Sequence, residues 1–510
     1  GLSAWRFNIG AGTYEQGDKS RITTPERRTE CFLNADGTYD WSKQAGQRWF
    51  LEKAVKTYNV TDIIGWQNSP PVYYTVRGLG FREFGDAKKT ILKADKFDDF
   101  AKFLANVVKH FKEEGIKINY ISPLNEPQWD WTVSAIGANN SQEGSPWTNE
   151  EIRDVVRSIN SQFVSDGVDS KIFISEAGSI NTLLKGTGVA YDQLNKLWNP
   201  SGSCFIGQNL NNFSNIISSH SYWADESAEA LVNTRQSLKD RMTDLGDYQY
   251  WQTEYSLLGN GYKFGFPNNR ILTPMESGIS LARVIHNDLS IANATGWQWW
   301  TTFELGKNMS AEDRYALIRL ALKTDKSDGV YEPSKLLYTL GNYSRFIRPG
   351  MKRIDVSRSD NATDIEAVST QMVSAFYDEK TNNVVMVVVN ASAQDCGIKL
   401  NVENLPNGIQ ADEFTPYITT DLDSDNIKRY PAVKSGSHYV IPGTSVVTFV
   451  SKANALSVEQ VVNAENKLII YPNPVKRGEE IVCKVNGATR LIISDINGRE
   501  ISRYDVVDSN

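Results

Sequence analysis

Short apolar runs alternate with amphipathic stretches over roughly the first 340 residues of the chain. The amphipathic stretches have helical spacing: between Phe97 and Phe111, apolar side chains recur every three or four positions. Gly115 stands where a C-terminal helix cap belongs, and Thr148 with Glu151 forms the capping-box pattern that begins another helix. The pattern therefore predicts helices between strand-like runs.

Seven of the apolar runs have the length and the β-branched and aromatic content of strands. Strands that alternate with helices are typical of a parallel sheet, so the expected class is α/β and the expected architecture is a (β/α)8 TIM barrel. Seven strands are one fewer than a closed barrel contains, and we expect the first strand to lie upstream of Gly1. The predicted strands span residues 5–10, 62–69, 119–127, 171–178, 215–223, 248–256 and 296–303.

The pattern changes after about residue 345, where short β runs separated by turn residues replace the helical periodicity. Residues 384–389 and 445–450 are the clearest runs, and they predict an antiparallel β-sandwich. We expect four parts: a barrel, a side β-sandwich, a polar linker and a small, incomplete all-β segment. Their predicted bounds are residues 1–345, 346–452, 453–466 and 467–510.

Two glutamates stand at the ends of predicted strands. Pro127 cannot continue a sheet ladder, so we expect one strand to end at Glu126 and to present this side chain at the barrel mouth. Glu254 ends the run YQYWQTE in the same way. Hydrolysis of a glycosidic bond with retention of configuration needs one protonated and one ionised carboxyl group. This pair could supply both.

Other side chains have competing interpretations. Glu176, in FISEAG, also lies near a strand end, and it could act in catalysis or could hold a neighbouring arginine or loop. Glu276 and Glu304 are more simply solvated surface groups. Aromatic residues make up 11% of the chain, which suits either a sugar-binding cleft or the core of a large barrel. Trp129 and Trp131 are the aromatic side chains placed to stack on a sugar beside Glu126.

Composition and missing motifs argue against several other classes of protein. The chain contains no GxSxG elbow, GxxxxGK[ST] loop, HExxH helix or dinucleotide fingerprint. A formal net charge of −7 argues against a nucleic-acid partner, and no apolar run of about 18 residues predicts a membrane span. The four cysteines and four histidines are scattered, so we expect no disulfide framework, no metal and no organic cofactor.

Five motifs occur in order along the chain: WRFNIGAGTYE at residues 5–15, NSPP at 68–71, ISPLNEP at 121–127, WQTEYS at 251–256 and NYSRFIRPGMKRI at 342–354. Together they resemble glycoside hydrolase family 30. The resemblance covers residues 1–452 and implies a retaining hydrolase on a barrel with a side β-sandwich. PPVYYT at residues 70–75 departs from the commoner PPxWM, which leaves the sugar subsites open.

The resemblance implies a role for each matching residue. Glu126 matches the acid/base catalyst, Glu254 the nucleophile, and Asn125 the asparagine that binds the sugar 2-hydroxyl. Arg6 matches an arginine that keeps the nucleophile ionised. His220 matches a group flanking the nucleophile, although a core histidine is the alternative. The remaining matches are Tyr222, also beside the nucleophile, and Trp299 or its neighbour Trp297, as an aromatic floor or as barrel packing.

The family acts on several β-linked glycans, and NIGAGTYE with GWQWWTT most resembles its endo-β-1,6-galactanase branch. Xylanase, β-1,6-glucanase and glucosylceramidase-like activities stay open. A non-catalytic carbohydrate-binding protein on a degenerate barrel is the alternative from another class. The expected partner is a polysaccharide or oligosaccharide, and the expected oligomeric state is a monomer.

The C-terminal segment has a resemblance of its own. YPNP at residues 471–474 and DING at residues 495–498 resemble the sorting domain of the type IX secretion system, here incomplete. This resemblance implies a protein secreted by, or held on the outer-membrane surface of, a Gram-negative bacterium of Bacteroidetes type.

Overall fold

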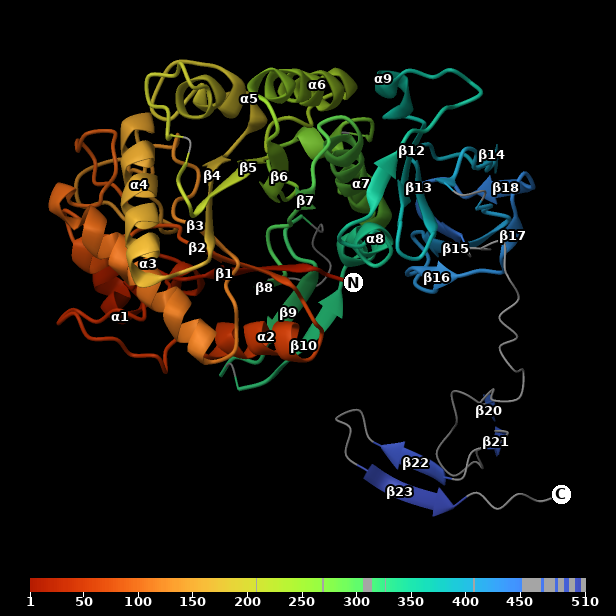
Figure 1. Ribbon diagram of the computed structural model, residues 1–510, viewed down its shortest axis with the longest axis horizontal. Helices are drawn as coiled ribbons and strands as arrows, with labels where there is room; N and C mark the ends of the chain where they lie inside the picture. Colours follow the sequence, from red (N-terminus) through yellow and green to blue (C-terminus); the bar gives the residue numbers. More distant parts are fainter. Residues whose placement is uncertain are drawn as a thin grey trace. The chain divides into compact units, whose positions relative to one another are not determined.

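The computed structural model describes residues 1–451 except 208, 268–269, 306–313, 326 and 407–408, together with four strands after residue 468. The chain divides into two compact units, one of residues 1–403 and 411–453 and one of residues 404–410 and 454–510. The first unit contains every predicted site residue (Figure 1).

A parallel seven-stranded sheet forms the centre of the first unit, and its strands pair in chain order. All seven predicted strands are present, which confirms the α/β class and the barrel type. The sheet is curled but open, because among the described residues no strand pairs β7 with β1 (Figure 1). The strands are β1 (Ala4–Asn8), β2 (Asp62–Trp66), β3 (Tyr120–Ser122), β4 (Lys171–Ala177), β5 (Phe213–His220), β6 (Gln249–Glu254) and β7 (Gly296–Trp297).

Helices cover the outer face of this sheet. The α3 helix buries Phe100, Leu104 and Phe111 completely, and each such side chain contributes about 1.5–3 kcal/mol of burial free energy. The predicted capping box of Thr148 and Glu151 is present at the start of α4. The helices are α1 (Thr13–Gln16), α2 (Ala45–Lys56), α3 (Phe97–Glu113), α4 (Asn149–Asp166), α5 (Ile180–Leu184), α6 (Ala228–Leu245) and α7 (Pro274–Ser290), with shorter turns at Gly17–Ser20, Pro25–Arg27, Val72–Tyr74, Ala94–Lys96, Leu194–Trp198 and Gly261–Lys263.

Two strand ends differ from their predictions. β3 ends at Ser122 and not at Glu126, because Pro123 has no backbone N–H to continue the ladder. β7 has only two residues, and the chain after it turns into a small sheet that the pattern did not predict. This sheet contains β8 (Phe303–Leu305), β9 (Ile318–Leu322) and β10 (Gly329–Pro333).

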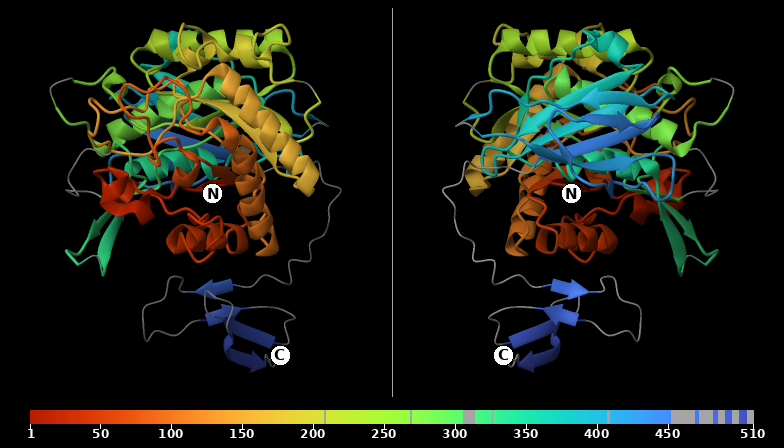
Figure 2. Two further views of the ribbon diagram at one scale, coloured as in Figure 1. Left: turned by 90° about the vertical axis from the view of Figure 1, so that its left-hand side faces the viewer. Right: turned by 90° about the vertical axis from the view of Figure 1, so that its right-hand side faces the viewer.

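The predicted β-sandwich lies against α7 and α8 (Lys335–Ser344), as the views in Figure 2 show. Asn342 of α8 is fully buried, and its amide nitrogen donates to Thr448 Oγ1 at 3.0 Å and to the Tyr417 carbonyl at 3.1 Å. These bonds satisfy a buried polar group and fix the helix to the sheet. The larger sheet holds β11 (Lys352–Ile354), β12 (Gln371–Tyr377), β13 (Val384–Asn390), β19 (Ser445–Ser451), β15 (Glu413–Thr419), β16 (Lys428–Arg429) and β17 (Val433–Lys434); beside it are β14 (Cys396–Lys399), β18 (His438–Ile441) and α9 (Asp364–Ala367).

The second unit contains two described hairpins, β20 (Ile469–Tyr471) with β21 (Val482–Lys484) and β22 (Arg490–Ser494) with β23 (Glu500–Asp505). The predicted linker at 453–466 lies outside the described residues, as do residues 472–474 and 495–498 of the two sorting motifs. No described helix is long and apolar enough to cross a membrane.

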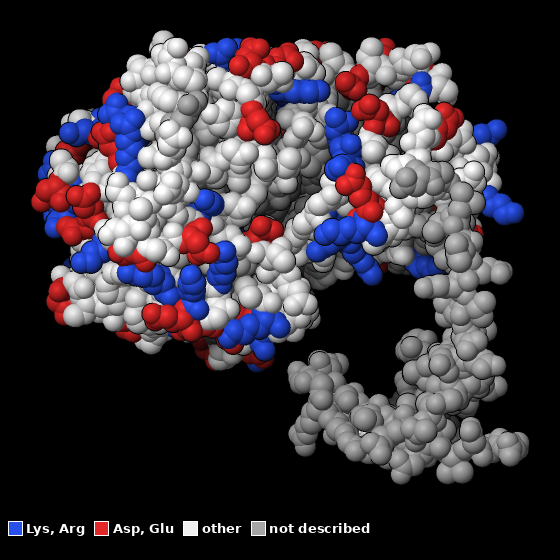
Figure 3. All heavy atoms as spheres, in the orientation of Figure 1, with Lys and Arg blue, Asp and Glu red and all other residues white. Residues whose placement is uncertain are grey.

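The described surface carries charges of both signs, and the described cysteines are unpaired. Lys and Arg side chains are interspersed with Asp and Glu over the face drawn in Figure 3. Cys31, Cys204 and Cys396 are free thiols, so no disulfide joins the cysteines whose side chains the structure describes.

Candidate active site

The carboxyl ends of the parallel strands bring the predicted charged residues to one edge of the sheet. Glu254 is the last residue of β6, and His220 is the last residue of β5, directly beside it. Arg6 comes from β1 and Glu176 from β4. Glu126 follows β3 in a turn, where its φ of +43° lies in a region that non-glycine residues rarely adopt. Such strained backbone is common where a fold positions a functional side chain.

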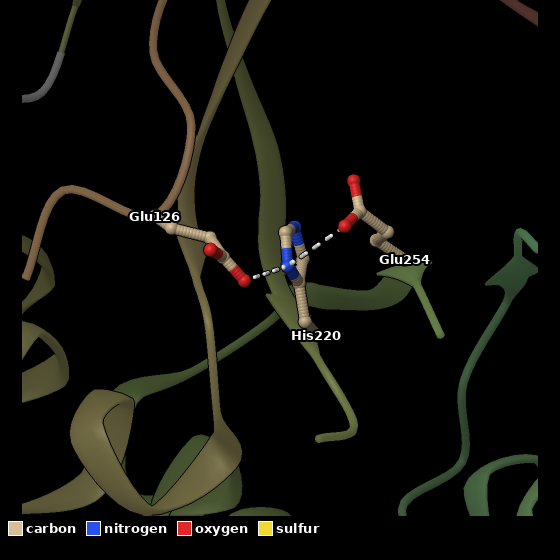
Figure 4. A group of neighbouring side chains, drawn as sticks. All are labelled: Glu126, His220 and Glu254. Carbon is tan, nitrogen blue, oxygen red and sulfur yellow. Dashed lines mark hydrogen bonds and ion pairs between the residues drawn. The ribbon is translucent and has the colours of Figure 1, made fainter. Parts of the chain in front are cut away.

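The carboxyl groups of Glu126 and Glu254 point toward each other across His220 (Figure 4). One oxygen of each glutamate and one nitrogen of His220 all lie within 4.8 Å of one another. Retaining glycosidases hold their two carboxyl groups about 5–5.5 Å apart, and inverting enzymes about 6.5–9.5 Å. The oxygens of the two glutamates are thus closer to the shorter of these two separations.

Glu254 accepts hydrogen bonds at both of its oxygens. Arg6 Nη1 donates to Oε2 at 2.6 Å, and the Tyr222 hydroxyl donates to Oε1 at 3.1 Å. The Arg6 guanidinium also lies 4.1 Å above the Trp66 ring, a cation–π contact. Two donors on two oxygens are the arrangement that an ionised carboxylate accepts.

Glu126 is buried like Glu254, but its carboxyl group contacts His220 and not an arginine within the described residues. Its Oε1 lies 3.0 Å from His220 Nδ1. Burial raises the pKa of Glu126, and the contact with His220 opposes this only in part. Its backbone is held on both sides: its N–H donates to the Glu176 carbonyl, and its carbonyl accepts from the Trp131 indole. Glu126 therefore keeps its proton to higher pH than an ordinary glutamate.

His220 links the carboxyl groups. Burial alone would lower its pKa, but the charge of Glu254 and the bonds to Glu126 and Glu176 raise it to about 10. Its Nε2 donates to Glu176 Oε2 at 2.9 Å. Burial would raise the pKa of Glu176, but Arg6 and His220 lower it on balance. Arg6 and His220 thus lie beside the carboxyl groups of Glu176 and Glu254, and burial favours the neutral form of Glu126 by raising its pKa.

Glu126, His220 and Glu254 also have the spacing of a metal-binding group. A protonated imidazole has no lone pair for a metal, and the pKa of His220 is about 10. The donor set therefore suits proton transfer better than metal ligation, and the expected lack of a cofactor stays a prediction.

Asn125 is oriented by a chain of side-chain amides. Its Oδ1 accepts from Arg6 Nη2 at 3.3 Å, and its Nδ2 donates to Asn68 Oδ1 at 3.1 Å. Asn68 in turn donates to the backbone carbonyl of Glu143 at 2.9 Å. These bonds leave the second amide hydrogen of Asn125 for a ligand. Asn68 belongs to the NSPP motif, but it was not among the predicted site residues.

A cavity of about 250 Å³ opens above the two glutamates. Trp297 and Trp299, predicted as a floor, do not line it: their indole N–H groups donate to Asp288 and to the Tyr315 carbonyl. Trp300, three residues after the end of β7, lines it instead. Glu304, at intermediate exposure, also lines it, whereas Glu276 caps α7. The lining is Arg27, Trp66, Asn68, Asn125, Glu126, Trp131, Gln142, Tyr222, Trp223, Glu254, Ser256, Leu258, Trp300, Glu304 and Tyr315.

A second hollow, of about 520 Å³, lies between α2 and α3 and away from these carboxyl groups. Its charged residues are paired with each other, Arg48 with Glu114 at 2.5 Å and Lys56 with Glu52 at 3.1 Å. It therefore offers no catalytic group that is free to act.

Known proteins resemble this chain in sequence and in structure. Glucuronoxylanase XynC of Bacillus subtilis is 26% identical over 377 residues, which cover 72% of this chain and 70% of that protein. An exo-beta-1,6-galactobiohydrolase of Bifidobacterium longum is 27% identical over 122 residues, 23% of this chain and 8% of that protein. A conserved exported protein from Bacteroides fragilis superposes with a TM-score of 0.77 and 34% identity, over 88% of each chain.

Residues 1–309 match O-glycosyl hydrolase family 30, and this match spans both glutamates and all the strands of the curled sheet. The barrel with its β-sandwich and the paired carboxyl groups at its mouth agree with that match. The chain therefore belongs to glycoside hydrolase family 30 and is a hydrolase of O-glycosyl bonds in carbohydrate.

Proposed function

We propose that this chain hydrolyses a β-linked polysaccharide with retention of configuration, by double displacement. The observation that carries the proposal is the placement of oxygens of Glu126 and Glu254 within 4.8 Å of each other. Glu254 attacks the anomeric carbon while Glu126 gives its proton to the leaving oxygen. Glu126 then takes a proton from the water that releases the sugar from Glu254.

The surrounding residues support these two roles. Arg6 and Tyr222 hold Glu254 by hydrogen bonds to its two oxygens. His220 and Glu176 hold Glu126 in place, and Asn125 has an amide hydrogen free for the 2-hydroxyl of the sugar. Trp129 adds an aromatic face for substrate, and Trp297 and Trp299 pack behind the cavity wall.

The stereochemistry of the product and a trapped intermediate test the mechanism. NMR of the first product should show the β-anomer, and a 2-deoxy-2-fluoro glycoside should label Glu254 in a mass spectrum. Glu254→Gln and Glu126→Gln should each lose at least about 100-fold in rate, and azide should rescue Glu126→Ala on an activated aryl glycoside. Glu276→Gln is the matched control, since Glu276 caps α7 and pairs with Arg270 and is not part of the cavity lining. An initial α-anomer would overturn the proposal.

For substrate, we propose internal cleavage of β-1,6-galactan. Support comes from the NIGAGTYE and GWQWWTT motifs and from the partial likeness to the exo-beta-1,6-galactobiohydrolase. The longer alignment with a glucuronoxylanase favours xylan as the second candidate. Incubation with β-1,6-galactan, β-1,6-glucan, glucuronoxylan and arabinogalactan, with products resolved by length, decides between them. Lack of release from all four, together with tight binding to one, would favour a non-catalytic binding protein.

We also propose export, by a bacterium of Bacteroidetes type, through a C-terminal sorting segment at residues 467–510. The likeness to an exported protein of Bacteroides fragilis and the YPNP and DING motifs support this. Deletion of residues 467–510 should leave the protein inside such a cell, and fractionation with antibody detection would reveal it. Limited proteolysis tests the proposed barrel at residues 1–345 and the proposed sandwich at residues 346–452. Light scattering tests the proposed monomeric state.

A further inference from the structure

We infer that Trp129 and Trp223 form the subsite for the sugar that leaves, on the Glu126 side of the cleaved bond. The inference rests on the proposed double displacement and names which side of the cavity holds each half of the substrate. Trp223 was not among the predicted site residues.

Two separate walls border the cavity. Trp66 is the last residue of β2 and Trp300 follows β7, and their rings meet edge to face at 5.9 Å. The Arg27 guanidinium lies 5.5 Å above the Trp300 ring, on the same wall. The side chain of Asn125 also faces this half, because it bonds to Asn68 just beyond β2. This wall therefore belongs to the half of the cavity where Asn125 can reach a sugar hydroxyl.

The opposite wall comes from the loops after β3 and β5. Trp223 lines the cavity there, and Trp129, which is not itself in the lining, meets the Trp223 ring edge to face, with ring centroids 5.3 Å apart and planes at 72°. Each is 37% exposed, which is unusual for so large an apolar side chain. Trp223 also contacts the Tyr222 ring at 5.5 Å, so the pair continues directly from the residue that holds Glu254.

Trp129 and the carboxyl group of Glu126 both lie beside Gly178. A Cβ atom placed on Gly178 would be 2.9 Å from Glu126 Oε1 and 2.9 Å from Trp129 Nε1. A side chain at position 178 would crowd both groups and also Gln128 Nε2, which would be 2.3 Å from the added Cβ atom. Within the described part of the chain, the Trp129 indole N–H has no hydrogen-bond acceptor, so it is free to bind a ligand oxygen.

The chemistry assigns this wall to the leaving sugar. Asn125 bonds to Asn68, whereas the carboxyl group of Glu126 lies beside His220 and Gly178, and the bond to be broken must lie within reach of both residues. Glu126 has to reach the leaving oxygen, so the ring attached to that oxygen falls on the side of Trp129 and Trp223. The flat C–H face of a sugar ring packs against an exposed indole, and burying both apolar surfaces is favourable.

The test compares two substrates of the same sugar. β-1,6-galactotriose has a sugar ring as leaving group, whereas β-galactosyl fluoride loses only fluoride. The corresponding glucosyl and xylosyl pairs are also assayed, and the comparison uses the pair that the wild-type protein hydrolyses fastest. For Trp129→Ala and Trp223→Ala we expect kcat/KM on the trisaccharide to fall about tenfold or more. The rate on the fluoride should stay within about twofold of wild type, and Trp223→Phe should retain most of the trisaccharide activity.

The matched control is Trp49→Ala, which removes an exposed tryptophan of α2 far from the cavity lining. Equal losses on both substrates would show that Trp129 and Trp223 only support the fold around Glu126. No loss on either substrate would show that no sugar binds at these tryptophans. Either outcome overturns the inference. If wild type hydrolyses no fluoride, or Glu254→Gln hydrolyses it at the wild-type rate, the proposed mechanism fails instead.

Discussion

Nη1 of Arg6 lies 2.6 Å from Oε2 of Glu254, although 248 positions separate the two residues in the chain. The same guanidinium reaches Glu176 at 3.2 Å and Asn125 at 3.3 Å. One side chain from the first strand therefore holds carboxylates from two other strands and the amide that precedes Glu126. Both carboxylates are buried, so these bonds act in a medium where charge-assisted donors are strong.

Arg6→Gln should reduce kcat/KM on an aryl β-glycoside about 100-fold or more, because one donor to a reacting carboxylate is worth about 2.7–4 kcal/mol. Arg6→Lys should lie between this variant and wild type, since an ammonium keeps the charge but loses the fork that spans three acceptors. Circular dichroism of each variant separates loss of rate from loss of fold. A rate for Arg6→Gln within tenfold of wild type would contradict the role.

The pH profile should report the raised pKa of Glu126. A general acid must be protonated, so kcat/KM falls as the pH rises through its pKa, and burial moves this fall to higher pH than for an ordinary glutamate. His220 lowers the pKa of Glu126, so His220→Gln should move the basic limb to still higher pH while reducing the maximum rate. A basic limb that stays in place or moves to lower pH in this variant would show that His220 does not act on Glu126.

Asn68 should act only through Asn125. Asn68→Ala frees the Asn125 amide from its 3.1 Å bond, and we expect kcat/KM to fall about tenfold on a substrate with a 2-hydroxyl. The loss should be small on the 2-deoxy substrate and in an Asn125→Ala background. Additive losses in the double variant would mean that Asn68 contributes independently of Asn125.

Glu143 should make stability depend on pH. Burial raises its pKa from the ordinary 4.5 to about 7, although Thr13 and Thr29 donate to its Oε1. Because the folded-state pKa is the higher one, the stabilising contribution is complete below pH 4.5 and is lost as the pH rises to about 7. Relative to Glu143→Gln, wild type should lose about 3 kcal/mol of unfolding free energy over this range. Denaturant curves of the two proteins, measured at each pH, give the difference in their unfolding free energies. A difference that stays constant with pH would disprove the raised pKa.

The buried pair of Arg235 and Asp288 should be needed for folding. Both side chains are 0% exposed, with Nε of Arg235 2.7 Å from Oδ1 of Asp288. Arg235→Met leaves the aspartate without its cation and should cost about 3–5 kcal/mol. The double variant Arg235→Met with Asp288→Leu should recover much of this loss, because two apolar groups replace two charges. Thermal melts that show the double variant as the least stable protein would refute this account.

The chain pattern alone located the elements of this fold. Apolar runs of period two and helices of period 3.6 are local properties, so all seven parallel strands could be predicted, together with α3, α4 and the β-sandwich. The Asn-Glu-Pro run and Glu254 could be singled out, because a carboxylate after an apolar strand is unusual and parallel strands share one edge. The local pattern was wrong about two strand ends: it placed the end of β3 at Glu126 and extended β7 to residue 303.

Only the tertiary structure decided which side chains meet. The 4.8 Å grouping of Glu126, His220 and Glu254 depends on how far the sheet curls, and no sequence interval encodes that curl. The same holds for Asn68 behind Asn125, for Trp300 at the cavity in place of Trp297 or Trp299, and for the pairing of Trp129 with Trp223. Residue types set what chemistry is possible, whereas packing between distant strands sets the distances, the burial and the pKa values on which that chemistry depends.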